Sequence, residues 1–153
     1  MGKKPFQFFT LLLVFLLASC AQEIKLQDII KNEEGHFRSI NIDDTPEKVL
    51  KTENRYYLAD SSINKNYLYY DIPFLMESEE GENNSFTIAY NFEENRLYEI
   101  QADIYISDED ECERIFNEFV ELYNRKYGQH ETDQGYLVWR TKSDIGDTIL
   151  IQL

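Results

Sequence analysis

Few side chains of this sequence have the arrangement that catalysis or metal binding would require. The two histidines, His36 and His130, are far apart in the chain, and no G-x-S-x-G motif accompanies either of them. The acidic run at 108–111 lacks the glycine and the distal glutamate of a calcium-binding loop, and its place at the start of a predicted helix accounts for its charge. The sequence therefore predicts a protein that is not an enzyme, with no catalytic residue, no metal site and no cofactor.

Cys20 stands at the end of a segment with the layout of a secretory signal. A basic head at residues 3–4 is followed by an apolar run at 11–17, which is shorter than the ~20 residues that a membrane-spanning helix needs. The residues before Cys20 complete a Leu-Ala-Ser-Cys sequence that resembles the bacterial lipobox. The resemblance implies that the Cys20 thiol receives a diacylglyceryl group, that residues 1–19 are removed, and that acyl chains such as palmitate anchor the protein to a membrane. An ordinary secretory signal and an uncleaved anchor are the alternatives.

The residues after Cys20 bear on where the anchored protein would face. Ala21 replaces the aspartate that can hold such proteins in the inner membrane, and no acidic export run follows directly. We therefore expect a lipid-anchored protein of the outer membrane that faces the periplasm. Residues 20–35 are predicted to form the lipidated cysteine and a tether, and residues 36–153 are predicted to form a single domain.

The chain is strongly acidic. Its 29 acidic and 15 basic side chains give a formal charge of −14, and removal of residues 1–19 would also remove Lys3 and Lys4. Such a chain is repelled by nucleic acid and by anionic lipid headgroups, so we expect no nucleic-acid partner. The same charge would steer the protein toward a basic protein partner, although acidity that serves solubility alone is the simpler alternative.

Cys112 is the second of the two cysteines. With Cys20 carrying a lipid, the remaining thiol has no partner for an internal disulfide. Helical spacing places Cys112 on the same apolar stripe as Ile115 and Phe119, and its sequence neighbours are acidic rather than cationic. The sequence therefore predicts a buried, unreactive thiol.

Hydrophobic periodicity predicts two long elements in the domain. Residues 86–92 alternate apolar and polar side chains and lead through a turn into a second alternating run at 98–106, which is the pattern of an antiparallel hairpin. Residues 108–127 repeat apolar side chains at helical spacing between an acidic first turn and Gly128. The shorter predicted elements are a strand at 37–43, a helix from Pro46 to near Glu53, strands at 56–59 and 67–72, and a closing hairpin at 136–141 and 148–153.

The order of these elements predicts an α+β fold in which one long and one short helix pack against an antiparallel sheet. A helix followed by a β-meander occurs twice, which fits a degenerate tandem repeat. The helix start Asp44-Thr45-Pro46-Glu47-Lys48-Val49-Leu50 and the Y-x-F-x-x-x-x-L pattern of the hairpin are similar to those of bacterial (Bacteroidetes-type) envelope lipoproteins with a β-lactamase-inhibitor-protein-like fold. That group includes an accessory subunit of the outer-membrane β-barrel assembly machinery. Asp44 stands where the group has glycine, and no functional residue of the group matches this chain.

Tyrosines supply the candidate binding surface. Strand parity places Tyr67, Tyr69 and Tyr105 on the outer face of the predicted sheet, and Tyr57 joins them if Leu58 is buried. Tyrosine rings contribute contact area at a low entropy cost, which is typical of interfaces, whereas tyrosine also favours strands in general. We therefore expect a partner-binding patch of tyrosines with acidic side chains around it.

The leading hypothesis is a non-enzymatic, lipid-anchored cell-envelope protein that binds another protein through this open sheet face, as an assembly accessory or an inhibitor. The alternative is an envelope module that binds a small ligand or a glycan and uses the same tyrosines as stacking platforms.

Overall fold

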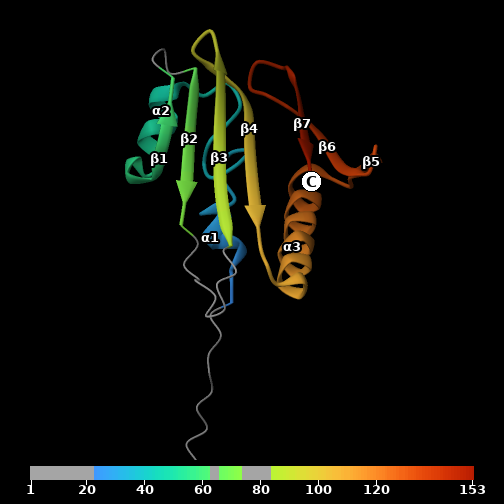
Figure 1. The fold of residues 1–153 in the computed structure, drawn as a ribbon. Helices are drawn as coiled ribbons and strands as arrows, with labels where there is room; N and C mark the ends of the chain where they lie inside the picture. The colour runs from blue at the N-terminus through green and yellow to red at the C-terminus, as the bar shows by residue number, and fades with distance from the viewer. Residues whose placement is uncertain (1–22, 63–65, 74–83) are drawn as a thin grey trace, which may run out of the picture.

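The computed structural model describes residues 23–62, 66–73 and 84–153, so the lipobox and Cys20 lie outside the described residues. The described part is α+β, as the element order predicts (Figure 1). Its helices are α1 (Leu26–Ile30), α2 (Pro46–Thr52), the 3-10 turn η1 (Arg55–Tyr57) and α3 (Glu109–Tyr127). Its strands are β1 (Leu58–Ser61), β2 (Tyr67–Ile72), β3 (Ser85–Glu93), β4 (Arg96–Tyr105), β5 (Glu131–Asp133), β6 (Tyr136–Lys142) and β7 (Thr148–Gln152).

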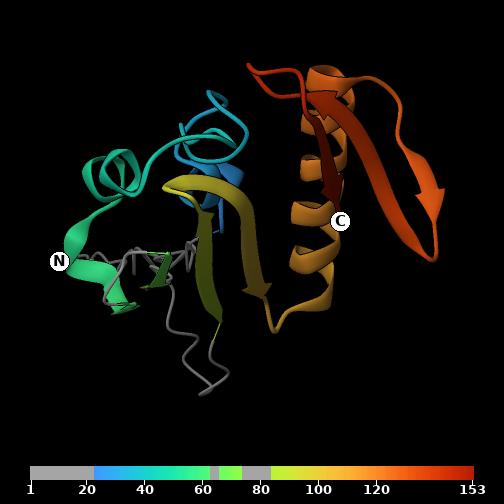
Figure 2. The ribbon, with the colours of Figure 1, turned by 90° about the horizontal axis from the view of Figure 1, so that it is seen from above.

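The strands form two antiparallel meanders rather than one sheet. The first has the order β1-β2-β3-β4 and the second has the order β5-β6-β7, and each follows a helix in the chain. Seen from above, α1, α2 and the chain between them cover one face of the four-stranded sheet, and α3 separates that sheet from the β5–β6 end of the second (Figure 2). None of the helices in the described residues is long and apolar enough to cross a membrane.

The inner face of the four-stranded sheet builds most of the core. Strict alternation in β3 buries Phe86, Ile88, Tyr90 and Phe92, and the register of β2 against β3 places its own inward residues directly beside them. Below them pack the apolar side chains of α1, the turn that follows it, and α2: Leu26, Ile29, Ile30, Phe37, Ile40 and Val49. The alternation seen in the sequence therefore determines which face of the sheet is covered.

Residues 37–43 do not form the predicted strand. Only the isolated bridge Phe37–Ile40 is present, because the chain turns tightly around Gly35, Arg38 and Ser39, whose φ angles are +64°, +54° and +64°. A Cβ at Gly35 would lie 2.8 Å from the backbone nitrogen of Ile40, so this turn requires glycine there. The turn directs Arg38 into the protein interior.

The prediction that Cys112 is buried is wrong, because its side chain is exposed. The buried side chains of α3 are Ile115, Phe119, Leu122 and Tyr123. Cys112 precedes Ile115 by three residues and so lies on the same side of α3, but it belongs to the first turn of the helix. Helical periodicity gives the direction of a side chain and cannot show whether another element lies opposite it.

A buried carboxylate joins three separate segments of the fold. Glu53, whose side chain is 1% exposed, accepts hydrogen bonds from Arg38 at 2.8 and 3.1 Å and from Lys31 at 2.5 Å. The hydroxyl of Tyr90 on β3 donates a further hydrogen bond to it at 2.8 Å. Arg38 also donates to the carbonyl of Ile29 at the end of α1 and lies over the ring of Phe86. This group of residues (Lys31, Arg38, Glu53 and Tyr90) is called the Glu53 cluster below.

The charge of Glu53 is maintained by its partners. Burial alone would raise the pKa of its carboxyl group, but the hydrogen bonds and charge of Arg38, together with Lys31, outweigh burial and hold the pKa below the ordinary value of 4.5. Burial and the nearby charge of Glu53 raise the pKa of Tyr90 well above 10.0, so its hydroxyl remains a donor. The cluster is therefore ionised, and its acid–base state is fixed, at neutral pH.

We expect Glu53→Gln to lower the free energy of unfolding by about 3 kcal/mol, because it leaves the buried guanidinium of Arg38 without its counter-ion. Urea titration of both proteins at pH 7 measures the difference. Glu121→Gln removes an exposed carboxylate of α3 and should change the free energy of unfolding by less than about 0.5 kcal/mol. Equal effects of the two substitutions would contradict the role of the cluster.

The same ion pair predicts a pH dependence of stability. Because the pKa of Glu53 is lower in the folded protein than in the unfolded chain, its contribution is complete above the unfolded value of 4.5 and is lost as the pH falls through the folded value. The difference in free energy of unfolding between wild type and Glu53→Gln should therefore shrink below that pH. Urea titrations at a series of acidic pH values test this, and a difference independent of pH would contradict it.

Candidate functional site

The outward side chains of the four-stranded sheet are half-buried or exposed among the described residues. The register aligns Tyr67 with Asn91 and Glu99, and Tyr69 with Ala89 and Gln101. Further along the strands it aligns the outward residues Asp71, Thr87 and Asp103, and then Ser85 with Tyr105. None of these outward positions holds lysine or arginine, and several are exposed carboxylates: Asp71, Glu99 and Asp103. This surface, the tyrosine face, is therefore acidic.

Tyr67 and Tyr69 form one unit on the tyrosine face. Their rings lie nearly parallel, with centroids 6.2 Å apart and 13° between the planes, and both side chains are half-buried. Burial, followed by the negative charge of Asp60, raises the pKa of Tyr67, so its hydroxyl stays protonated and available as a donor. A pair of this kind offers a broad apolar surface with polar tips to a partner.

The structure places Tyr105 and Tyr57 differently from this pair. Tyr105, which is 60% exposed, lies on the same face but at the opposite end of β4, since it aligns with Ser85 rather than with the middle of β3. Tyr57 belongs to η1 and packs partly against the core, so the prediction that it joins the face is wrong. The predicted strand at 56–59 begins later, at Leu58, because Asn54 caps a 3-10 turn by accepting a hydrogen bond from the Tyr56 N–H.

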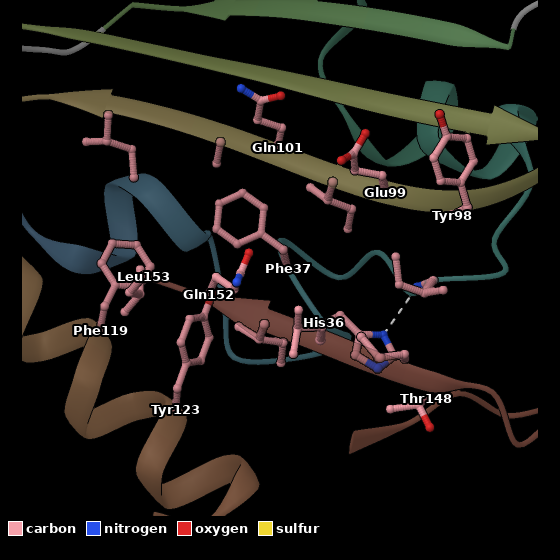
Figure 3. Close-up of a pocket in the computed structure, with 17 residues that line it drawn as sticks. His36, Phe37, Tyr98, Glu99, Gln101, Phe119, Tyr123, Thr148, Gln152 and Leu153 are labelled. Atoms are coloured by element: carbon pink, nitrogen blue, oxygen red, sulfur yellow. Dashed lines mark hydrogen bonds between the residues drawn. The ribbon is translucent and has the colours of Figure 1, made fainter. Parts of the chain in front are cut away.

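A groove between β4 and β7 was missed by reasoning from the sequence. It encloses a cavity of about 640 Å³, and Figure 3 shows the two strands on opposite sides of it. Phe119 and Tyr123 of α3 lie at one end, and Phe37 points into it from the chain between α1 and α2 (Figure 3). Inward residues of β4 line the groove, yet Ala102 is exposed and Ile100 and Ile104 are only half-buried. Alternation marks these residues as inward, but nothing in it shows that they lack a covering element.

Acidic side chains gather at the other end of the groove, where β4 and β7 both begin. Asp43, Glu93, Glu94 and Asp147 line a smaller hollow there, together with Arg96, which is paired with Asp43. The Arg96 hydrogen bond and charge lower the pKa of Asp43, so that its carboxylate is ionised at neutral pH. This end of the groove therefore carries an excess of negative charge.

His36 is one of the titratable residues that line the groove. Its Nδ1 lies 3.2 Å from the backbone nitrogen of Ile42, whose N–H it accepts. Burial, followed by the positive charge of Lys126, lowers the pKa of His36 below 6.5, so the ring is neutral at pH 7. No group of three or more metal-ligating side chains occurs within the described ranges. The groove is suited to binding apolar or backbone groups.

No protein-family model matches the chain, and comparisons with curated proteins and with solved structures find no match. The tyrosine face and the groove are therefore the features of the molecule that bear on its function.

Proposed function

We propose that this chain is a non-enzymatic, lipid-anchored protein of the bacterial cell envelope that binds another protein through the tyrosine face. The observation that carries the proposal is an uncovered sheet face on which paired and separate tyrosines alternate with carboxylates. Tyrosine is enriched among the residues that dominate binding energy, and a face of one charge favours association with an opposite one. A partner with a basic surface fits this chemistry.

The anchor in this proposal rests on the Leu-Ala-Ser-Cys sequence at residues 17–20. A diacylglyceryl group on Cys20, with a further acyl chain on its amino group, supplies enough apolar surface for stable attachment. The anchored domain then faces the periplasm from the outer membrane. In that setting the partner is another envelope protein, and the role is that of an assembly accessory or an inhibitor.

Cys20→Ser should give a precursor that keeps its leader and takes up no fatty-acid probe, because the acceptor thiol is gone. Metabolic labelling with an alkyne fatty acid, followed by gel mobility, measures both effects. Cys112→Ser is the matched control, and it should leave labelling unchanged. Normal maturation of Cys20→Ser would contradict lipidation.

Tyr69→Ala and Tyr105→Ala should each weaken binding of the envelope partner by roughly fivefold to thirtyfold, since truncation of a tyrosine that anchors an interface costs ~1–2 kcal/mol. Affinity is measured with the partner identified by crosslinking in native membranes. Association should also slow as salt rises, because a charged rim is screened over ~8 Å at physiological ionic strength.

Tyr136→Ala is the control for the tyrosine face, because Tyr136 is 55% exposed but lies on β6 in the other sheet. It should leave binding unchanged. Urea titrations of all three variants separate weakened binding from unfolding. Equal loss of affinity in the three variants, or none in Tyr69→Ala and Tyr105→Ala, would contradict the proposed face.

A second candidate function is favoured by the groove. Its volume of about 640 Å³ falls within the ~300–1,000 Å³ typical of ligand sites. The parallel rings of Tyr67 and Tyr69 also provide a flat stacking surface for a sugar ring. A small-ligand or glycan-binding envelope module is therefore the alternative, and a screen of glycans by thermal shift discriminates it from protein binding.

A further inference from the structure

The groove between β4 and β7 is bounded by the backbone edges of both strands. Consecutive residues of β4, from Tyr98 to Ala102, and of β7, from Thr148 to Gln152, line the cavity, so side chains of both parities border it. A surface lined by every residue of a strand is the strand's hydrogen-bonding edge rather than one of its faces. β4 and β7 are also terminal strands of their sheets.

The free groups on β4 follow from its pairing with β3. Phe92 donates its N–H to the carbonyl of Asn66, just before β2, so the even-numbered residues of β3 bond toward β2. Because the residues of a strand bond alternately to its two sides, the odd-numbered residues of β3 bond toward β4. Through the register, Glu99, Gln101 and Asp103 bond back to β3. The N–H and C=O groups that point into the groove therefore belong to the alternate residues, Ile100, Ala102 and Ile104.

The free groups on β7 follow in the same way from β6. Leu153 exchanges both backbone hydrogen bonds with Leu137, and Ser143 donates to Asp147, so the odd-numbered residues of β7 bond to β6. The N–H and C=O groups that point into the groove belong to Thr148, Leu150 and Gln152. Among the described residues, no backbone–backbone hydrogen bond to these groups, or to those of Ile100, Ala102 and Ile104, is present.

The direction of the two edges is compatible with one strand between them. β4 and β7 run in the same direction, since Tyr98 and Thr148 lie at one end of the groove and Gln101 and Gln152 lie toward the other (Figure 3). A strand between them can be antiparallel to both. Residues of such a strand bond alternately to its two neighbours. The residues whose side chains point inward would form backbone hydrogen bonds with Ile100, Ala102 and Ile104, whose side chains also point inward. The residues whose side chains point outward would form backbone hydrogen bonds with Thr148, Leu150 and Gln152, whose side chains point outward.

We propose that the groove between β4 and β7 binds an extended segment of a partner protein, which pairs antiparallel with both strands and joins the two sheets into one. The inference deepens the proposed function by naming a second contact and the kind of segment that makes it. Main-chain hydrogen bonds at two edges supply affinity, and alternate side chains supply specificity.

The walls of the groove define the alternation in that segment. Its inward side chains would lie between Ile100 and Ile104 and above Phe37 and Phe119, all of which line the cavity. Apolar side chains are therefore required at alternate positions. The outward side chains would lie among Glu99, Gln101 and Gln152, which are exposed, and polar residues fit there.

The carboxylates at one end of the groove predict the orientation in which the segment binds. An antiparallel strand ends where β4 and β7 begin, which is the end lined by Asp43, Glu93, Glu94 and Asp147. Basic residues at the C-terminal end of the segment therefore face carboxylates, whereas basic residues at its N-terminal end face Phe119 and Tyr123. We therefore expect the groove to bind an extended segment with apolar residues at alternate positions and basic residues at its C-terminal end.

The probe is a fluorescently labelled peptide, acetyl-Thr-Val-Thr-Val-Thr-Val-Lys-Lys-amide, added to the full chain and followed by anisotropy. Its reversed sequence, acetyl-Lys-Lys-Val-Thr-Val-Thr-Val-Thr-amide, has the same composition. We expect the first peptide to bind about tenfold more tightly at low salt, and the difference to shrink as salt screens the carboxylates. Equal affinity of the two peptides at low salt would overturn the direction, and no binding of either would overturn the site.

Two substitutions at one position separate backbone pairing from side-chain contact. Leu150→Pro removes an N–H that points into the groove and leaves the β6 ladder intact, which is the position in which an edge strand tolerates proline. Leu150→Ala removes the half-exposed side chain but keeps the N–H. We expect Leu150→Pro to weaken peptide binding about fivefold or more and Leu150→Ala to weaken it less. A urea titration verifies that both variants fold.

Amide hydrogen exchange provides an independent measurement on the unmodified chain. Binding of the peptide should slow exchange at Ala102, Ile104, Leu150 and Gln152, whose N–H groups point into the groove. Exchange at Gln101 and Ile151, which are already bonded within their sheets, should change little. Unchanged exchange at the first set, or wild-type affinity in Leu150→Pro, would overturn the proposal.

Two further results would identify a different occupant of the groove or show which of the two proposals fails. Protection of the same amides that rises with protein concentration, without peptide, would show that a second copy of this chain fills the groove and would overturn the assignment to a partner. Tyr69→Ala should leave peptide binding unchanged. If the peptide fails while Tyr69→Ala still weakens the envelope partner, this inference fails alone. If the peptide binds while Tyr69→Ala leaves binding of the envelope partner unchanged, the tyrosine face is rejected and the groove proposal stands.

Discussion

A buried carboxylate can stay ionised only where its charge and its hydrogen-bonding capacity are both satisfied, and Glu53 meets this requirement with partners from three segments. Lys31 follows α1, Arg38 belongs to the tight turn around Gly35, and Tyr90 lies in the middle of β3. Each of these contacts requires its own segment to lie beside Glu53 at the end of α2. The Glu53 cluster therefore couples the helical layer to the four-stranded sheet.

The position of that turn determines the shape of the groove. Phe37, directly before Arg38, and Ile42, which follows the turn, both line the cavity, and the chain then reaches the edge of β4. There Asp43 and Asp44 bond to the backbone of Leu97 and occupy the first position on the outer edge of β4. No other described residue forms a backbone–backbone hydrogen bond with the rest of that edge. The groove and its floor thus depend on the same residues that hold Glu53, although Glu53 itself does not line the groove.

Periodic and local signals predicted the elements well, and contacts between elements poorly. The alternation from Phe86 to Phe92 gave the inward face of β3, and Thr45-Pro46 gave the start of α2, because each depends on neighbours in the chain. Arg38 and Glu53 are ordinary charged residues until folding brings them together. Likewise, Cys112 has the right spacing for burial, yet its side chain is exposed. The tyrosine face was predicted for Tyr67, Tyr69 and Tyr105 because parity alone decides it, and it failed for Tyr57, which lies in a turn.

The arrangement of the four sheet edges has a consequence for self-association. Unpaired edges invite other chains to add strands, which can continue into polymers. The outer edges here are poor templates, since β1 is short and interrupted by a register shift at Asp60, and β5 is a three-residue strand that includes Glu131 and Asp133. The longer edges of β4 and β7 face each other across the groove. The proposed occupant of this groove is a single extended chain, whereas the edge of another folded sheet would bring its neighbouring strands with it. If one segment pairs with both long edges, as we propose, neither of them is left as a template on which further chains could polymerise.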